Sequence, residues 1–144
     1  MQQLPHHYHV HARAAETGTV SLAAHGVPTL ETAPPAEFGG PGDRWSPETL
    51  LVGAVADCFI LTFRAVARAS GIEWRSLECE VEGVLDRVER RTSFTEFRVK
   101  ARLAVPEGVD LEKAQRALEK AEQGCLVTNS LRAPSHLEPH VEHA

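Results

Sequence analysis

The sequence contains little that would fit a secreted, membrane-bound or nucleic-acid-binding protein. It has only three cysteines in 144 residues, too few for a disulfide framework, so the thiols are expected to be redox-active, metal-binding or simply buried. Its charges are mixed, with a formal net charge of -5 and no basic stripe, which excludes nucleic acid as an expected partner. The amino terminus lacks a basic region followed by an apolar stretch, so we expect neither export nor membrane insertion and predict a cytoplasmic protein.

The length and composition fit one folded domain covering residues 1–144. Hydrophobic residues make up 42% of the chain, enough for an ordinary core without disulfides. From Tyr8 to Glu31, short apolar runs are separated by Gly18 and Gly26, which predicts two or three strands in a meander. The next segment, 33–43, is rich in proline and glycine and predicts an irregular loop.

A long helix is the strongest element in the sequence. The tripeptide 46–48 (Ser-Pro-Glu) predicts its start, and Gly71 predicts its end after Ser70. Its middle, from Leu50 to Ala67, is apolar around most of the circumference, which is typical of a helix packed on both sides. We therefore predict a long central helix that is buried, and because a chain of this size has little spare material to cover it, an intimate homodimer.

The second half of the sequence predicts a strand pair followed by another helix. Apolar residues alternate from Glu73 to Glu89 and from Thr92 to Val105, which indicates two long antiparallel strands with a turn at 90–91. Asp110 is the expected cap of an amphipathic helix that ends near Gly124. The predicted fold class is α+β, with antiparallel sheets packed on helices and the chain ending in a short tail.

The three cysteines differ in their surroundings. Cys58 lies in the middle of the long helix and Cys125 just past the second helix, which suits a peroxidatic and a resolving thiol brought together by folding. A buried, unreactive Cys58 is the alternative interpretation. A metal pair is disfavoured, because neither residue has a Cys or His at the usual zinc-ligand spacing. Cys79 falls in an alternating strand and is expected to be inert core.

Charged partners for Cys58 are limited. On an apolar helix, desolvation raises the pKa of a thiol, so we expect a nearby cation, with Arg44 and Arg13 as candidates. Glu48 is either a charged partner or a first-turn acid that favours the helix dipole. It precedes Cys58 by ten residues, roughly 15 Å along one helix at about 1.5 Å per residue. If both serve one site, Glu48 must come from the other subunit.

Histidines gather near both ends of the sequence. No cysteine or carboxylate completes a ligand set beside them, and we predict no metal site and no bound cofactor. The residues concerned are His6, His7, His9, His11, His136, His140 and His143.

Four stretches of sequence carry a resemblance to a known family. They are Ser46-Pro47-Glu48-Thr49-Leu50-Leu51, Ala56-Asp57-Cys58, Gly83-Val84-Leu85, and residues 121–127 (AEQGCLV) with Ser130-Leu131. In this order and spacing the sequence resembles the OsmC/Ohr family of organic hydroperoxide resistance and osmotically induced proteins, from about Val10 onward. The Gly-rich loop 39–42 favours its OsmC-like branch.

The resemblance implies an OsmC-like fold, an intertwined homodimer and a small-molecule organic hydroperoxide as substrate. It implies that Cys58 attacks the peroxide, becomes a sulfenic acid and is resolved by Cys125 as a disulfide. Glu48 matches the acid that pairs with an activating arginine in the family. An external dithiol, such as a lipoyl group, is the implied reductant.

This sequence departs from the family pattern at one place. The family arginine lies in the turn between the first two strands, where residues 15–19 (AETGT) offer no cation. Arg13, slightly earlier, or Arg44 is therefore expected to substitute. The missing arginine also favours an alternative function, a binding module that holds a small apolar ligand at the dimer cleft without efficient peroxidase activity.

Overall fold

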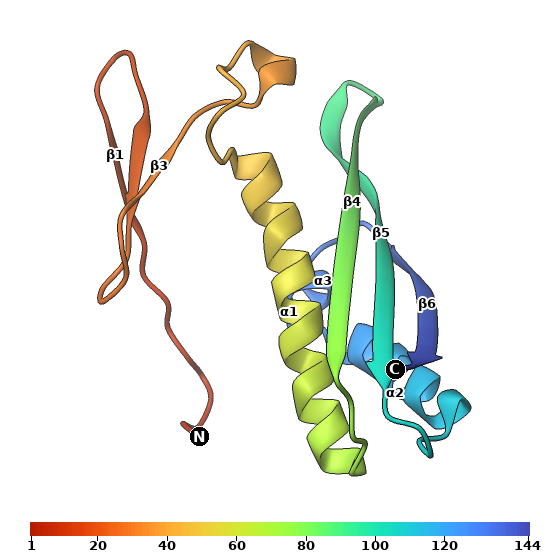
Figure 1. Ribbon diagram of the computed structural model, residues 1–144. Coiled ribbons are helices and arrows are strands. Elements are labelled where there is room, and N and C mark those ends of the chain that lie inside the picture. Colours follow the sequence, from red (N-terminus) through yellow and green to blue (C-terminus); the bar gives the residue numbers. More distant parts are fainter. The chain divides into compact units, whose positions relative to one another are not determined.

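The chain folds into an α+β structure with two small sheets and a central helix, as the sequence predicts (Figure 1). The computed structural model describes residues 1–144, which divide into two compact units, Met1–Leu50 and Leu51–Ala144. One domain over the whole chain stays a prediction.

The first unit contains an antiparallel meander of three strands in the order β1-β2-β3, in agreement with the predicted two or three. Its strands are β1 (His11–Ala14), β2 (Val20–Ala23) and β3 (Leu30–Thr32). The hydroxyl of Ser21 donates to the carboxylate of Glu31 across the sheet at 2.6 Å. The segment predicted as an irregular loop contains a short 3-10 helix, η1 (Ala36–Phe38), because its amides bond back to Pro35 and Ala36.

The central helix α1 (Pro47–Ser70) begins and ends where the sequence predicts. The hydroxyl oxygen of Ser46 accepts from the amide of Thr49 at 3.1 Å, which satisfies one of the free donors of the first turn. At the other end, Gly71 adopts a φ of 66°. The amide of Ile72 then reaches back to the carbonyl of Ala67 at 2.9 Å and closes the helix.

Within the second unit, burial of α1 is one-sided, and cover of its other side by a second copy stays a prediction. Its fully buried side chains form one stripe at helical spacing: Val55, Phe59, Phe63 and Ala67. Leu61, on another face, is 51% exposed. By length and composition alone α1 would also fit a membrane span, but its buried stripe forms part of the hydrophobic core of the second unit.

The sheet of the second unit has the order β4-β5-β6. Its strands are β4 (Ser76–Val88), β5 (Arg91–Val105) and β6 (Ser135–His143). The predicted hairpin is confirmed, with its turn one residue earlier than expected at Glu89-Arg90, where both residues have positive φ, 51° and 66°. β6 pairs in parallel with β5. The sequence predicts a short tail for this segment, and the strand was not predicted.

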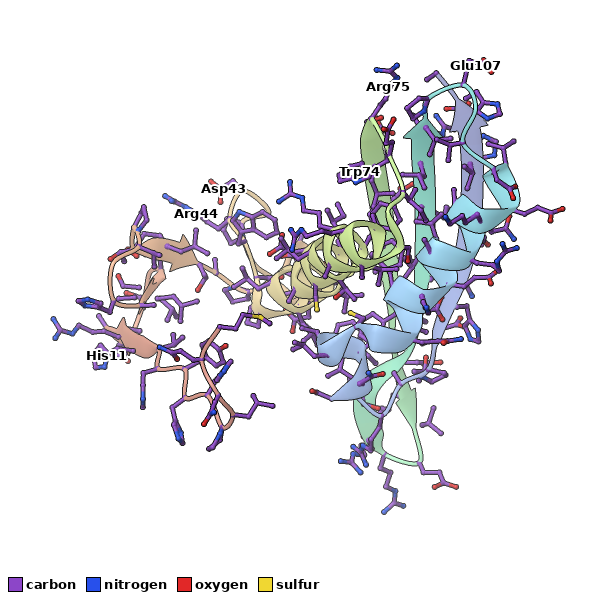
Figure 2. All side chains as sticks on the ribbon, turned by 90° about the horizontal axis from the view of Figure 1, so that it is seen from below. His11, Asp43, Arg44, Trp74, Arg75 and Glu107 are labelled. Atoms are coloured by element: carbon purple, nitrogen blue, oxygen red, sulfur yellow. The ribbon has the colours of Figure 1, made fainter.

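Two helices complete the second unit. They are α2 (Leu111–Gly124), which is capped by Asp110 as predicted, and a single turn, α3 (Leu126–Asn129), which was not predicted. α1 and α2 lie on one face of the sheet (Figures 1 and 2). Cys125 is the only residue between α2 and α3, so the end of one helix and the start of the next meet at this thiol.

Candidate thiol site

Folding of the second unit brings two thiols together. Cys58 is half-buried on α1, Cys125 is 1% exposed, and neither forms a disulfide. The Cys125 side chain is one of the hydrogen-bonding groups that lower the pKa of the Cys58 thiol. The end of α2 packs against α1 here: a Cβ added at Gly124 would lie 3.5 Å from the methyl carbon of Thr62, within van der Waals contact. Two free thiols, one on α1 and one after α2, therefore share one site.

The surroundings of Cys58 favour its thiolate. Burial is the largest single influence and raises the pKa of this thiol. Hydrogen bonds from the backbone of Val127, the Cys125 thiol, the Thr62 hydroxyl and the backbone of Leu126 together outweigh burial, so the pKa is lowered. A lowered pKa raises the fraction of the nucleophilic form at neutral pH.

The donors that stabilise this thiolate were not found from the sequence. Peptide amides at the start of α3 contribute to the lowered pKa of Cys58, and a nearby cation stays a prediction. The sequence does not indicate which backbone amides point toward a thiol. Only Gly124 and the position of Cys125 after a helix indicated that this segment belongs to the site. Thr62 could have been noticed, since it lies one turn after Cys58 on the same face.

Thr62 contacts Cys58 in two ways. Its hydroxyl donates to the carbonyl oxygen of Cys58 at 2.7 Å. The same oxygen lies 3.8 Å from the sulfur of Cys58. The hydroxyl is therefore shared between the backbone and the reactive atom.

Cys79 packs against the hydrophobic core, as predicted. Burial, together with a smaller effect of charge on Cys125, raises the pKa of Cys79 to about 11. This thiol stays protonated at neutral pH and is a poor nucleophile.

The charged residues proposed from sequence, Glu48, Arg44 and Arg13, belong to the first unit, and their roles stay predictions. Oε1 of Glu48 is buried without a hydrogen-bond partner. Such an atom is costly unless a donor reaches it. Arg44 lies on the exposed loop before α1 (Figure 2) and lines a depression of about 680 Å³ with Trp45. Arg13 is exposed on β1.

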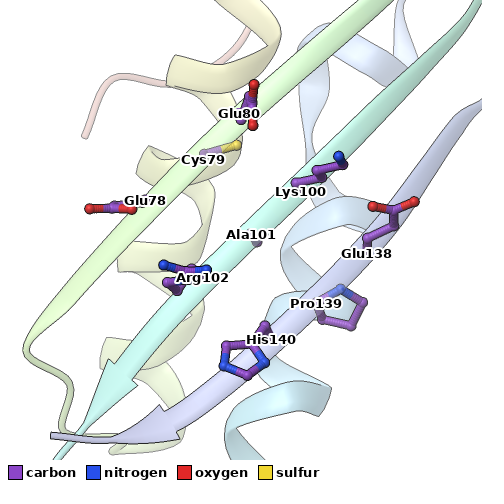
Figure 3. Close-up of a pocket in the computed structure, with 9 residues that line it drawn as sticks. All are labelled: Glu78, Cys79, Glu80, Lys100, Ala101, Arg102, Glu138, Pro139 and His140. Carbon is purple, nitrogen blue, oxygen red and sulfur yellow. The ribbon is translucent and has the colours of Figure 1, made fainter.

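A second depression, of about 550 Å³, lies on the outer face of the β4-β5-β6 sheet (Figure 3). Its charged side chains are Glu78, Glu80, Lys100, Arg102, Glu138 and His140. The strand register places Lys100 opposite both Glu80 and Glu138, so positive and negative residues alternate across the strands. Such cross-strand pairs stabilise a sheet surface. With the side chain of Cys79 packed toward the core, this face contributes no nucleophile.

The histidines do not form a ligand cluster. His136 lies 3.6 Å from a carboxylate oxygen of Glu96, and His140 lies 3.5 Å from one of Glu142. No group of three or more His, Cys, Asp or Glu side chains is arranged to hold a metal ion.

These features define a class: small α+β proteins in which a helix-borne thiol faces a second thiol beyond a neighbouring helix. The chain matches the family model for OsmC-like protein over residues 40–140. It therefore belongs to the OsmC-like protein family, as the motifs at 46–58 and 121–127 indicated.

Individual relatives agree with this assignment. The chain is 26% identical to the uncharacterized protein YmaD of Bacillus subtilis over 107 residues, which covers 72% of this chain and 71% of that protein. It is 29% identical to peroxiredoxin OsmC of Escherichia coli over 93 residues. That match covers 65% of this chain and 64% of the E. coli protein, slightly under two thirds of its length.

Solved structures share the fold. An OsmC-like protein of unknown function from Vibrio cholerae superposes with a TM-score of 0.86 at 14% identity, covering 94% of this chain and 99% of that chain. An organic hydroperoxide resistance protein from Elizabethkingia anophelis superposes with a TM-score of 0.71 at 25% identity, covering 100% of both chains.

Proposed function

We propose that this protein is a cysteine-based peroxidase that reduces organic hydroperoxides through Cys58 and Cys125. The observation that carries the proposal is the Cys58 thiol, whose pKa is lowered by hydrogen-bonding groups that include the Cys125 side chain. Membership of the OsmC-like family supports it, as do the peroxiredoxin and organic hydroperoxide resistance relatives. The cytoplasm, as a reducing compartment, fits a protein whose cysteines are free.

The proposed reaction has three steps. The thiolate of Cys58 attacks a peroxide oxygen, the O–O bond breaks, and after protonation the organic part leaves as an alcohol while Cys58 becomes a sulfenic acid. The thiol of Cys125 then attacks this sulfur, and a disulfide forms as water leaves. An external dithiol, such as a lipoyl group, reduces the disulfide by thiol–disulfide exchange and is itself oxidised.

The proposal includes a homodimer. The exposed side of α1 carries Leu61, and covering such a surface with a second copy removes apolar area from water. The buried Oε1 of Glu48 needs a donor, and an arginine, Arg13 or Arg44, has the required chemistry. We propose that Glu48 and one of these arginines act at the site of the partner subunit.

The test is a titration of the reduced protein with cumene hydroperoxide, followed by intact mass measurement and counting of free thiols. We expect one equivalent of peroxide to remove both thiols of Cys58 and Cys125 and to lower the mass by two hydrogens. Cys58→Ser abolishes consumption, and Cys125→Ser consumes peroxide but accumulates an oxygen adduct. Cys79→Ser is the matched control and behaves as wild type. Full consumption by the Cys58→Ser protein refutes the proposal.

The second candidate is a binding module for a small apolar ligand. The absence of a cation from the turn at 15–19 favours it. The two functions separate in the same titration, because a binding module leaves the free thiols unchanged at equimolar peroxide.

A further inference from the structure

We propose that Thr62 is a positioning residue for Cys58, whose hydroxyl directs the oxidised sulfur toward disulfide formation rather than further oxidation. This inference rests on the proposed peroxidase function and adds a residue to its site. Thr62 is part of none of the sequence motifs at 46–58 or 121–127, and its contacts with Cys58 and Gly124 place it at the thiol site.

The geometry of Thr62 is fixed from two sides. Its hydroxyl oxygen lies 2.7 Å from the Cys58 carbonyl oxygen and 3.8 Å from the Cys58 sulfur. Its methyl carbon faces Gly124 at the end of α2, where a Cβ would lie 3.5 Å away. A β-branched side chain in a helix has few rotamers. With the methyl group against α2, the hydroxyl is held toward Cys58.

The hydroxyl can serve the sulfur in each oxidation state. A threonine hydroxyl has one hydrogen and can also accept, and the hydrogen rotates freely about the C–O bond. In the neutral thiol form it donates to the backbone carbonyl. When the sulfur becomes a thiolate, or carries an oxygen as a sulfenic acid, the hydrogen turns to that negative or polar atom.

The consequence concerns the step in which Cys125 attacks. Thr62 reaches the sulfur from α1, and Cys125, just after α2, is a second side chain that acts on it. A sulfenic oxygen held by the Thr62 hydroxyl leaves the side of the sulfur toward Cys125 open. As the S–S bond forms and the S–O bond breaks, the oxygen takes the Cys125 proton and leaves as water.

The experiment compares Thr62→Val, which removes the hydroxyl with little change of shape, with Thr62→Ser, which keeps it. Thr62→Ala removes the same hydroxyl and replaces the valine variant if that one does not fold. Thr95→Val is the matched control, since Thr95 also donates to a backbone carbonyl, that of Val84 at 3.3 Å, away from the thiols. Two readouts are measured: the pH profile of Cys58 alkylation by iodoacetamide, and the ratio of disulfide to sulfinic acid after peroxide.

We expect Thr62→Val to shift the alkylation profile to higher pH and to lower the ratio of disulfide to sulfinic acid roughly tenfold, the size of one hydrogen bond to a charged group. Thr62→Ser and Thr95→Val keep the wild-type profile and ratio. A Thr62→Val protein with the wild-type profile and ratio overturns the inference. Wild-type protein that does not consume peroxide refutes the proposed function instead, and the alkylation profile then still decides whether Thr62 acts on Cys58.

Discussion

Replacing Leu126 by proline removes one amide donor from the Cys58 sulfur without disturbing the helix around it. Leu126 is the first residue of α3, where proline is well tolerated. The preceding residue, Cys125, has φ -68° and ψ 106°, an extended conformation that a following proline favours. The side chain is 69% exposed, so its loss costs little packing.

The expected effect follows from the contacts of Cys58. The backbone of Leu126 is one of the groups that lower the pKa of this thiol, and Leu126→Pro removes its amide hydrogen. A hydrogen bond to a charged group contributes about 1.5–3 kcal/mol. Because Cys58 is half-buried and the Leu126 contribution is the smallest of the four donors, we discount this to about 1 kcal/mol, or roughly a fivefold lower acid dissociation constant of the thiol.

The assay is the pH dependence of Cys58 alkylation, followed by mass spectrometry to separate it from the other thiols. Leu126→Ala is the matched control, because it loses the same side chain but keeps the amide. We expect the Leu126→Pro profile to move to higher pH and the Leu126→Ala profile to stay in place. Coincident profiles for the two variants, with both proteins folded by circular dichroism, refute the idea that the start of α3 stabilises the thiolate.

Three further predictions concern the core, a cap and pH. Gly83→Ala destabilises the protein by about 1–3 kcal/mol in urea unfolding, because a Cβ there lies 2.7 Å from Cγ2 of Val52; an unchanged midpoint contradicts this packing. Asp110→Ala lowers the unfolding free energy by about 1 kcal/mol, since its carboxylate accepts from the amide of Glu112 at 2.9 Å, whereas Asp110→Asn retains most of it. The lowered pKa of Cys58 stabilises the folded state above the thiol's ordinary value of 9.0, and this contribution is lost as pH falls through the lowered pKa. Wild type and Cys58→Ser therefore diverge in unfolding free energy toward alkaline pH, and parallel curves contradict the lowered pKa.

The elements that the sequence predicted well are those whose signals are local. Ser46 marks the start of α1 and Gly71 marks its end. Both could be predicted because a capping side chain and a left-handed glycine act within a single turn. β6 was missed, although Leu137, Pro139 and Val141 alternate toward the core, because its pairing with β5 is parallel and depends on a crossover through α2. Pro134 and Pro139 argued only against a helix in this segment.

In the candidate site, too, some residues could be predicted from the sequence and others could not. Cys58 and Cys125 could be named from the sequence, because a cysteine in an apolar helix and a second one after a helix are visible as residue types. The amides of Leu126 and Val127 could not be named from the sequence, because every residue except proline has an amide. Only the turn of α3 directs these two toward the sulfur of Cys58. The expectation of a nearby cation counted side chains alone, and the roles of Arg44 and Arg13 stay predictions.

The two cysteines of the proposed disulfide differ in their exposure to solvent. At 1% exposure, the Cys125 sulfur is shielded from any dithiol in solution, while the half-buried Cys58 is open to one. An incoming thiolate must approach in line with the S–S bond, so the mixed disulfide forms on Cys58 and Cys125 departs as the leaving group. The enzyme would thus admit its reductant through the same opening that admits the peroxide.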